Sequence, residues 1–234
     1  MISFRHAAIM LCGAMLLVPA MQANVVAPGG SASPDNLDGL ANLFGAAIAP
    51  LLSSPVSSST FSGTMLSDVY VDPFTHDLDF VYQYVAGTNP PQQGVERITA
   101  ANFSPTAADG TFADPFGTGV GIDMGYDATS TLAGFTATTS PLANGVTRSA
   151  DGTVAGFNFS GAANITAGQE SPLLIIRTHA TTYVVGQGGV IDSQTANVNV
   201  YAPAPEPRLV GLAAIALFGV VALFFRRRKA QANN

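Results

Sequence analysis

Cysteine, tryptophan and charge are scarce in this sequence, and each shortage excludes a class of protein. The 234 residues include one Cys, no Trp and only 10% charged residues. A charged fraction far below the usual value of about 25% argues against charge-driven disorder and against coiled coils. The 24 Gly and 15 Pro argue against long helical bundles. A chain of this length with 47% hydrophobic residues can fill one core of ordinary domain size.

Positive charge is almost missing from the middle of the chain. Between residues 24 and 205, three basic residues, Arg97, Arg148 and Arg177, stand against fourteen acids, so this stretch has a formal charge of −11. Such an acidic body repels phosphate backbones, and we therefore expect no nucleic-acid partner. Cations, or a polymer bridged by cations, fit this charge better.

The N-terminus has the pattern of a secretory signal. Arg5 precedes an uncharged run over residues 7–18, and small residues follow it. Twelve residues of helix reach about 18 Å, too short for a bilayer core of about 30 Å. We expect residues 1–23 to form a signal helix that the Sec translocon reads, with cleavage after residue 23 or after Ala20. Cys12 leaves with it, so the mature chain has no thiol chemistry. An N-terminal anchor is the alternative.

The C-terminus carries a second apolar segment, over residues 209–225, without one charge. Seventeen residues give about 25 Å of helix, the lower limit for spanning a membrane. The four residues that follow are all basic: Arg226, Arg227, Arg228 and Lys229. Basic residues stay on the cytoplasmic side, so the sequence predicts a transmembrane helix over 209–225 with a basic tail over 226–229. A buried core helix is the alternative.

Just before this helix stands the triplet Pro205-Glu206-Pro207. The two prolines keep the backbone extended and accessible above the membrane. The order of triplet, apolar helix and basic cluster over residues 204–234 resembles the PEP-CTERM sorting signal of bacterial exported proteins. The resemblance implies recognition by an exosortase-type enzyme, removal of the tail after a transient stay in the inner membrane, and release to the cell surface or the exopolysaccharide matrix of a biofilm. A permanently anchored protein is the alternative.

The middle of the chain has the periodicity of strands. Residues 77–85 alternate polar and apolar, which places four side chains on one face: Leu78, Phe80, Tyr82 and Tyr84. Residues 72–76 form the turn between this strand and one over 61–71. The apolar run 173–176 predicts a central strand buried on both faces. Further strands are expected at 94–103, 121–126, 153–160, 173–182 and 196–202. Turns or loops are expected at 87–91, 108–119, 144–145, 151–152 and 186–189.

These patterns predict a mainly β fold, a β-sandwich of about eight short antiparallel strands over residues 60–203. Residues 24–59 precede it as a leader and first element. Its part over 25–36 is rich in Pro, Gly and Ser and is expected to be mobile or extended, while 37–52 reads as a helix or partly as a strand. The body is similar to the uncharacterised ectodomains that precede such sorting tails. Four segments carry this resemblance: 80–84, 125–126, 171–179 and 200–203. It implies export and a β-rich body, and no known activity.

Two clusters of aspartates are candidate cation sites. Asp68, Asp72, Asp77 and Asp79 surround one turn, and oxygen ligands around a turn are what Ca²⁺ requires. Their spacing does not match the helical Ca²⁺ loop, and Asp is common in turns, so both interpretations stay open. A second cluster has the same two interpretations: Asp109, Asp114, Asp123 and Asp127. No other cofactor is expected.

Catalytic signatures are missing. The body has two histidines, His76 and His179, and no Gly-x-Ser-x-Gly or His-Glu-x-x-His pattern, so we expect no enzyme. His76 fits a turn and His179 a strand at a sheet edge. Arg177, within the apolar strand, needs a carboxylate partner or an edge position.

Two functions compete on this basis. The first is a non-enzymatic surface or matrix protein that associates with exopolysaccharide. The second is a secreted carbohydrate-active hydrolase that uses carboxylates on the sheet. A concave face lined by Tyr82, Tyr84 and Tyr126 would favour binding. Two acids roughly 5 to 10 Å apart in a cleft would favour hydrolysis.

Overall fold

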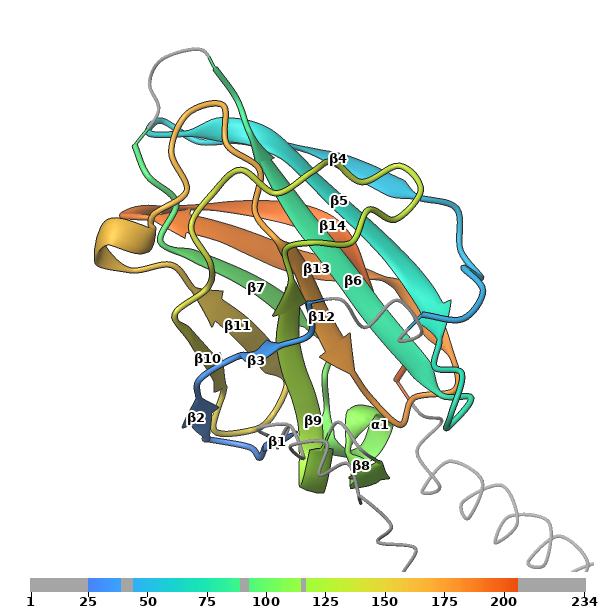
Figure 1. Cartoon of the computed structure of the whole chain (residues 1–234). Coiled ribbons are helices and arrows are strands. Elements are labelled where there is room, and N and C mark those ends of the chain that lie inside the picture. Colours follow the sequence, from blue (N-terminus) through green and yellow to red (C-terminus); the bar gives the residue numbers. More distant parts are fainter. Residues whose placement is uncertain (1–24, 39–43, 89–92, 115–116, 206–234) are drawn as a thin grey trace, which may run out of the picture.

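The computed structural model describes residues 25–38, 44–88, 93–114 and 117–205 (Figure 1). The expected signal helix, the transmembrane helix over 209–225 and the basic tail lie outside these ranges. Within them, none of the helices has the length and hydropathy needed to cross a bilayer. Helix is limited there to α1 (Pro105–Ala108) and the 3-10 turn η1 (Gly161–Ala163). The prediction of a mainly β fold is confirmed, in the form of two sheets.

The larger sheet contains eight strands and lies nearer the viewer in Figure 1. Its path runs β1-β9-β12-β6-β5-β4, and β3 and β8 pair with β9 beside that path. The strands are β1 (Val25–Val26), β3 (Asp35–Asn36), β4 (Leu52–Ser57), β5 (Ser62–Val71), β6 (Leu78–Ala86), β8 (Gly110–Asp114), β9 (Gly117–Asp127) and β12 (Leu173–Arg177). All pairs are antiparallel except β3 with β9.

The smaller sheet contains six strands in the order β14-β13-β7-β11-β10-β2, all antiparallel. The strands are β2 (Ser31–Ala32), β7 (Arg97–Ala101), β10 (Gly145–Arg148), β11 (Val154–Asn158), β13 (Tyr183–Asp192) and β14 (Gln194–Pro203). Ten residue pairs join β13 to β14, which makes this hairpin the longest ladder of the sheet.

One apolar core lies between the two sheets. The larger sheet contributes Val69, Phe80 and Ile122, and the smaller sheet contributes Phe157 and Val190, each no more than 2% exposed. Burying such side chains stabilises the fold by about 1.5–3 kcal/mol each. Because strand residues alternate, every second side chain of both sheets is left for the outer faces.

The edge strands of the two sheets meet along one side of the molecule, where β14 contacts β4 and β5. The Ser54 hydroxyl of β4 donates to the Asn199 carbonyl of β14 at 2.8 Å. The Tyr82 hydroxyl of β6 donates to the Tyr201 carbonyl at 2.7 Å. These contacts hold the C-terminal part of β14 against the larger sheet.

Several strand predictions are confirmed. Leu78, Phe80, Tyr82 and Tyr84 all face the core. Residues 72–76 do lie in the connection between β5 and β6. β12 lies between β9 and β6 and is buried along its whole length, as its apolar run predicts.

The predicted number of strands over residues 60–203 is too low, because the described part of that range contains ten strands rather than about eight. The leader 25–36 contributes three further short strands that pair with β9 and β10, so of its two expected forms, mobile or extended, these strands have the extended one. Segment 186–189 lies inside β13 and is not a turn. A Cβ on Gly188 would lie 2.7 Å from the Thr99 carbonyl oxygen, so this glycine permits close packing of β13 against β7.

Two other segments differ from their expected forms. Residues expected as a loop over 108–119 include β8 and the start of β9, and Gly145 begins β10. In the segment 37–52, the described residues contain no helix: Ala47 makes an isolated bridge to Tyr70, and β4 begins at Leu52.

Candidate functional site

The outer face of the larger sheet is covered. Apolar side chains from the sheet and from the segments crossing it form a second buried cluster: Leu37, Leu66, Tyr70, Val81, Phe135, Leu173 and Ile175. The Gln83 side chain fastens one crossing segment, because its amide donates to the Thr136 carbonyl at 2.8 Å and accepts from the Thr136 N–H at 2.9 Å. This face is therefore part of the interior and not a binding surface.

A row of charges lies buried at one end of this covered face. Arg177 of β12 has Asp79 of β6 and Asp123 of β9 as its register neighbours. Its guanidinium contacts Asp123 at 3.1 Å and Asp72, beyond the end of β5, at 2.7 Å. All four side chains are at most 2% exposed. The prediction that Arg177 needs a carboxylate partner is confirmed.

The environment of this row changes the protonation of its members. Burial raises the pKa of Asp123 to about 7, against the attraction of Arg177, and the Asp35 carboxyl raises it further. Burial also raises the pKa of Asp68, and the hydrogen bond from the Val69 N–H opposes that rise. Asp123 is therefore only partly ionised near neutral pH.

The first predicted cation cluster is divided among other partners. Asp72 accepts from the N–H groups of Phe74 and Thr75 and pairs with Arg177. Asp77 contacts Nδ1 of His179 at 2.7 Å. Asp79 is the register neighbour of Arg177, and Asp68 binds the backbone of Val69. In the described part of the chain, no three His, Cys, Asp or Glu side chains converge as a metal site.

The second predicted cluster is also dispersed. Asp109 pairs with the buried guanidinium of Arg148. Asp127 accepts from the N–H groups of Thr129 and Ser130 and so shapes a turn. Asp123 belongs to the buried charge row, and the side chain of Asp114 lies outside the described part. The described members are structural acids that bind arginine or backbone.

The two histidines of the body both lie outside the strands. His76 lies in the β5–β6 turn with a positive φ of 65°, as expected for a turn residue. His179 was expected in an edge strand, but β12 ends at Arg177 and is a central strand, so that prediction is wrong. His179 instead pairs with Asp77 and packs where a Cβ on Gly110 would collide with its ring.

Tyr82, Tyr84 and Tyr126, which would favour binding if they lined a concave face, lie in the core. Tyr82 and Tyr84 are 2% and 0% exposed, and Tyr126 is 9% exposed. The hydroxyls of Tyr82 and Tyr84 each donate to a backbone carbonyl, so burial leaves neither polar tip unpaired. The three tyrosines therefore line no concave face, and the feature that would have favoured binding over hydrolysis is not met by them.

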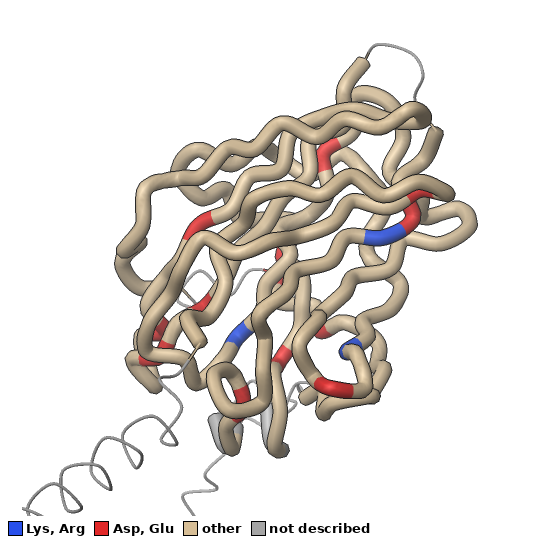
Figure 2. The backbone as a smooth tube through the Cα atoms, turned by 180° about the vertical axis from the view of Figure 1, so that it is seen from behind, with Lys and Arg blue, Asp and Glu red and all other residues tan. Residues whose placement is uncertain are grey.

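The outer face of the smaller sheet, in contrast, is open. On the neighbouring strands β14, β13 and β7, the residues that face outward are mainly amides, hydroxyls and glycine: Thr195, Asn197, Asn199, Gln187, Gly189 and Thr99. Charged residues are few along these strands, and most acids gather toward the lower end of the molecule (Figure 2). We call this surface the open polar face.

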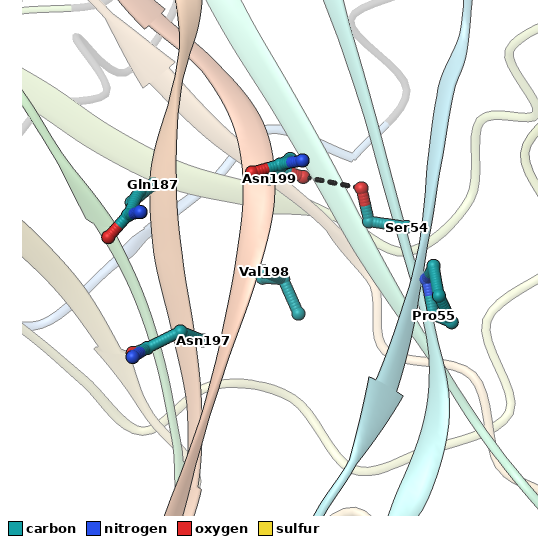
Figure 3. Close-up of a pocket in the computed structure, with 6 residues that line it drawn as sticks. All are labelled: Ser54, Pro55, Gln187, Asn197, Val198 and Asn199. Carbon is teal, nitrogen blue, oxygen red and sulfur yellow. Dashed lines mark hydrogen bonds between the residues drawn. The ribbon is translucent and has the colours of Figure 1, made fainter.

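Three hollows lie on or beside the open polar face. The first, of about 220 Å³, lies between β4 and β14 (Figure 3) and is lined by Ser54, Pro55, Gln187, Asn197, Val198 and Asn199. The second, of about 160 Å³, is lined by Thr99, Ala101, Val154, Gln187, Gly188, Gly189, Thr195 and Asn197. The third, of about 460 Å³, is lined by Glu96, Arg97, Asn144, Gly145, Asn158, Ser160 and Ile191. The first two share Gln187 and Asn197.

Arg97 is the charged residue of β7 on this face. Its guanidinium donates to the Asn158 side-chain oxygen at 3.1 Å and to the Thr147 hydroxyl at 2.7 Å. Partial burial lowers its pKa. Its partners are neutral oxygens, so Arg97 keeps its positive charge without a paired carboxylate in these contacts.

Sequence reasoning did not find the open polar face. The segment 186–189 was interpreted as a turn because of its glycines, and this removed Gln187 and Gly189 from the predicted sheet. The alternation of Val198 and Val200 with Asn197 and Asn199 was the available signal, since it marks a strand with one polar face.

The predicted sorting residues lie at the end of the described chain. Pro205 is exposed two residues after β14. Glu206, Pro207 and the basic cluster from Arg226 to Lys229 lie outside the described residues. Comparison of the chain with family models, with curated proteins and with solved structures gives no match.

Proposed function

We propose that this chain is an exported, non-enzymatic surface or matrix protein whose open polar face associates with extracellular polysaccharide. The observation that carries the proposal is the contrast between a covered outer face on one sheet and an uncovered one, lined by amides and hydroxyls, on the other. Amide and hydroxyl groups both donate and accept hydrogen bonds, as sugar hydroxyls do.

The termini support the destination. A signal peptide over 1–23 delivers the chain to the Sec translocon, and the triplet at Pro205, Glu206 and Pro207 precedes an apolar helix and a basic cluster. The exposed Pro205 leaves the start of this triplet accessible. In the proposed route, an exosortase-type enzyme removes the tail at the inner membrane and releases the body to the cell surface or matrix.

The alternative of a secreted hydrolase has weaker support. Glycoside cleavage requires two carboxyl groups on opposite sides of the scissile bond. Among the residues that line the three hollows, Glu96 is the one acid. Binding without cleavage needs no such pair, so the geometry favours it.

Fractionation of cells that carry the intact gene tests the sorting step. We expect the protein in the matrix fraction, with a mass that excludes residues 226–229. Glu206→Gln should leave the uncleaved chain in the inner membrane, while Glu170→Gln, a matched control in the body, should be sorted normally. Wild-type protein that keeps Arg226 to Lys229 and stays in the inner membrane would contradict the proposal.

Association with polysaccharide is tested on the same cultures. Protein in extracted matrix should sediment with the polysaccharide and should pass into the soluble fraction when glycosidases digest the polymer. Sedimentation that does not change on digestion would show that the protein is held by something else.

A further inference from the structure

The open polar face carries a row of small residues that runs across its strands. Asn197 of β14 is the register neighbour of Gly189 in β13, which is opposite Thr99 of β7. Thr99 is in turn opposite Gly156 of β11, which is opposite Thr147 of β10. Neighbouring strands are about 4.8 Å apart, so these five residues span about 19 Å. Every second residue of the row is a glycine, and its floor is backbone at those points.

Larger side chains border this row on both sides. Gln187 and Asn199 border it on one side, and Thr195, Ile191 and Arg97 border it on the other. Because Gly189 has no side chain, the space above it belongs to the second hollow. A Cβ at that position would lie 2.9 Å from the Thr99 hydroxyl oxygen and 3.6 Å from Cγ2 of Thr195.

Arg97 closes the row at its far end. A Cβ on Gly156 would lie 2.5 Å from one terminal nitrogen of Arg97, so the guanidinium lies directly over this glycine. It is held there by Thr147 and Asn158. The open part of the row therefore runs from Asn197 over Gly189 to Thr99.

At its other end the row continues into the hollow beside β4. Both hollows are lined by Gln187 and Asn197, so they form one path from Ser54 and Pro55 across β14 and β13 to β7. In Figure 3, Ser54 and Pro55 lie on the strand that faces β14 across the first hollow. We call this path the cross-strand groove.

We propose that the cross-strand groove binds an uncharged polysaccharide chain laid across the strands. This inference rests on the proposed function and names its substrate class. The residues that line the two hollows of the groove include no charged side chain. A polycation would therefore find no carboxylate in the groove. A polyanion would approach a body of formal charge −11, and the nearest cation, Arg97, already donates to two oxygens.

The chemistry of the groove also predicts how tightly it binds. It offers amide and hydroxyl groups on a shallow floor and no aromatic ring on which a sugar could stack. Each protein–sugar hydrogen bond replaces one to water, so a single site should have a Kd of about 1 mM. A polymer that binds many copies of the protein at once forms a more stable complex than one site would give, because the weak contacts act together.

The test uses protein made from the intact gene and purified from the cells that produce it. Binding is measured to dextran and a soluble β-glucan as neutral probes, to alginate as an anionic probe and to chitosan as a cationic probe. The variant Gly189→Thr fills the groove, and a threonine suits a strand at this ordinary backbone conformation. Gln194→Ala is the matched control, because Gln194 is exposed on β14 and does not line the three hollows.

We expect at least one neutral probe to bind, with an affinity that changes less than twofold between 50 and 500 mM salt. Gly189→Thr should lower that affinity at least tenfold, with a thermal midpoint measured beside it because the new Cβ displaces the Thr99 hydroxyl, and Gln194→Ala should change the affinity less than twofold. Because Gly189→Thr can disturb packing, Asn197→Ala gives a second test, with an expected fivefold loss.

Other outcomes separate this inference from the proposed function. Binding to alginate or chitosan alone, with strong salt dependence, would overturn the uncharged substrate and leave polysaccharide association standing. If the protein binds none of the four probes and glycosidase digestion does not release it from the matrix, both the uncharged substrate and the proposed polysaccharide association are overturned. A dimer that Gly189→Thr dissociates would assign the groove to a second copy of the chain.

Discussion

The two outer faces of this molecule differ in what lies over their strands. On the larger sheet, crossing segments bury the face, and its few charges are enclosed with Arg177 at their centre. On the smaller sheet, hollows open over β14, β13 and β7, and the outward side chains are mainly amides and hydroxyls beside the exposed Val185.

The contrast shows where this chain uses its charge. Buried ions need partners with fixed geometry, and Arg177, Asp72 and Asp123 supply them to one another. An exposed surface that binds a neutral polymer needs hydrogen-bonding groups without strong hydration, and neutral side chains provide these at lower desolvation cost. A shortage of charge is therefore compatible with both faces.

The largest test of the contrast is to remove a cation from each face. Arg177→Met leaves buried carboxylates without their cation and should lower the free energy of unfolding by about 3–5 kcal/mol. Arg97→Met, on the open polar face, loses hydrogen bonds to neutral partners and should cost about 1 kcal/mol. Urea unfolding measures both. Equal costs would mean that the two faces do not differ in this respect, and Asp123→Asn should recover part of the Arg177→Met loss.

A second test compares two glutamines. Gln83→Leu removes the hydrogen bonds of a fully buried amide to the backbone of Thr136 and to the buried Ser171 carbonyl, and should cost about 1–3 kcal/mol. Gln187→Leu on the open polar face should change the free energy of unfolding by no more than about 0.5 kcal/mol. Hydrogen exchange should report faster exchange of the Thr136 N–H in the Gln83 variant alone. Slow exchange there would show that Gln83 does not fasten the covering segment.

The raised pKa of Asp123 gives the covered face its own pH dependence. The folded protein keeps this proton up to about pH 7, while the unfolded chain loses it near pH 4. The folded state therefore binds more protons between these values, and stability falls as pH rises from 5 to 7, by about 1–2 kcal/mol from this group. Asp123→Asn should remove that part of the slope. Asp151→Asn should leave it, because hydrogen bonds from Ser149 and Thr153 lower the pKa of Asp151 to about 2.

The smallest effect on stability is expected where the effect on binding is large. Asn197→Ala should change the thermal midpoint by less than about 2 °C, since an exposed substitution costs under about 0.5 kcal/mol. Sedimentation with matrix polysaccharide should nevertheless fall. A variant that loses stability and keeps binding would reverse the roles assigned to the open polar face.

Local periodicity carried the correct fold predictions. The alternation over 77–85 and the apolar run 173–176 each reflect which faces of a single strand are buried. Residues adjacent in sequence are enough to show this. The requirement that Arg177 have a carboxylate partner also follows from its apolar surroundings. Its partners could not be identified in that way, because Asp72 and Asp123 lie 105 and 54 residues from it in sequence.

Long-range packing explains the wrong predictions. Glycine is common in turns, but at Gly188 the absence of a side chain leaves room for the Thr99 carbonyl of the neighbouring strand β7. The strand pattern places Tyr82 on one face with Phe80 and Tyr84, but it does not identify the acceptor of the Tyr82 hydroxyl, the Tyr201 carbonyl, which is 119 residues away in sequence. In both cases the partner that decides the role comes from a distant part of the chain.

The join between β4 and β14 has a consequence for crowding. An exposed edge strand can pair with strands of other molecules and so lead to fibres. This is a hazard for any β protein that accumulates at high local concentration. Here the Ser54 hydroxyl of β4 donates to the Asn199 carbonyl of β14, the edge strand of the other sheet. Pro55 also removes one backbone donor from β4. This edge is therefore a poor template for strand addition, so copies of the protein at high local concentration can stay separate folded units.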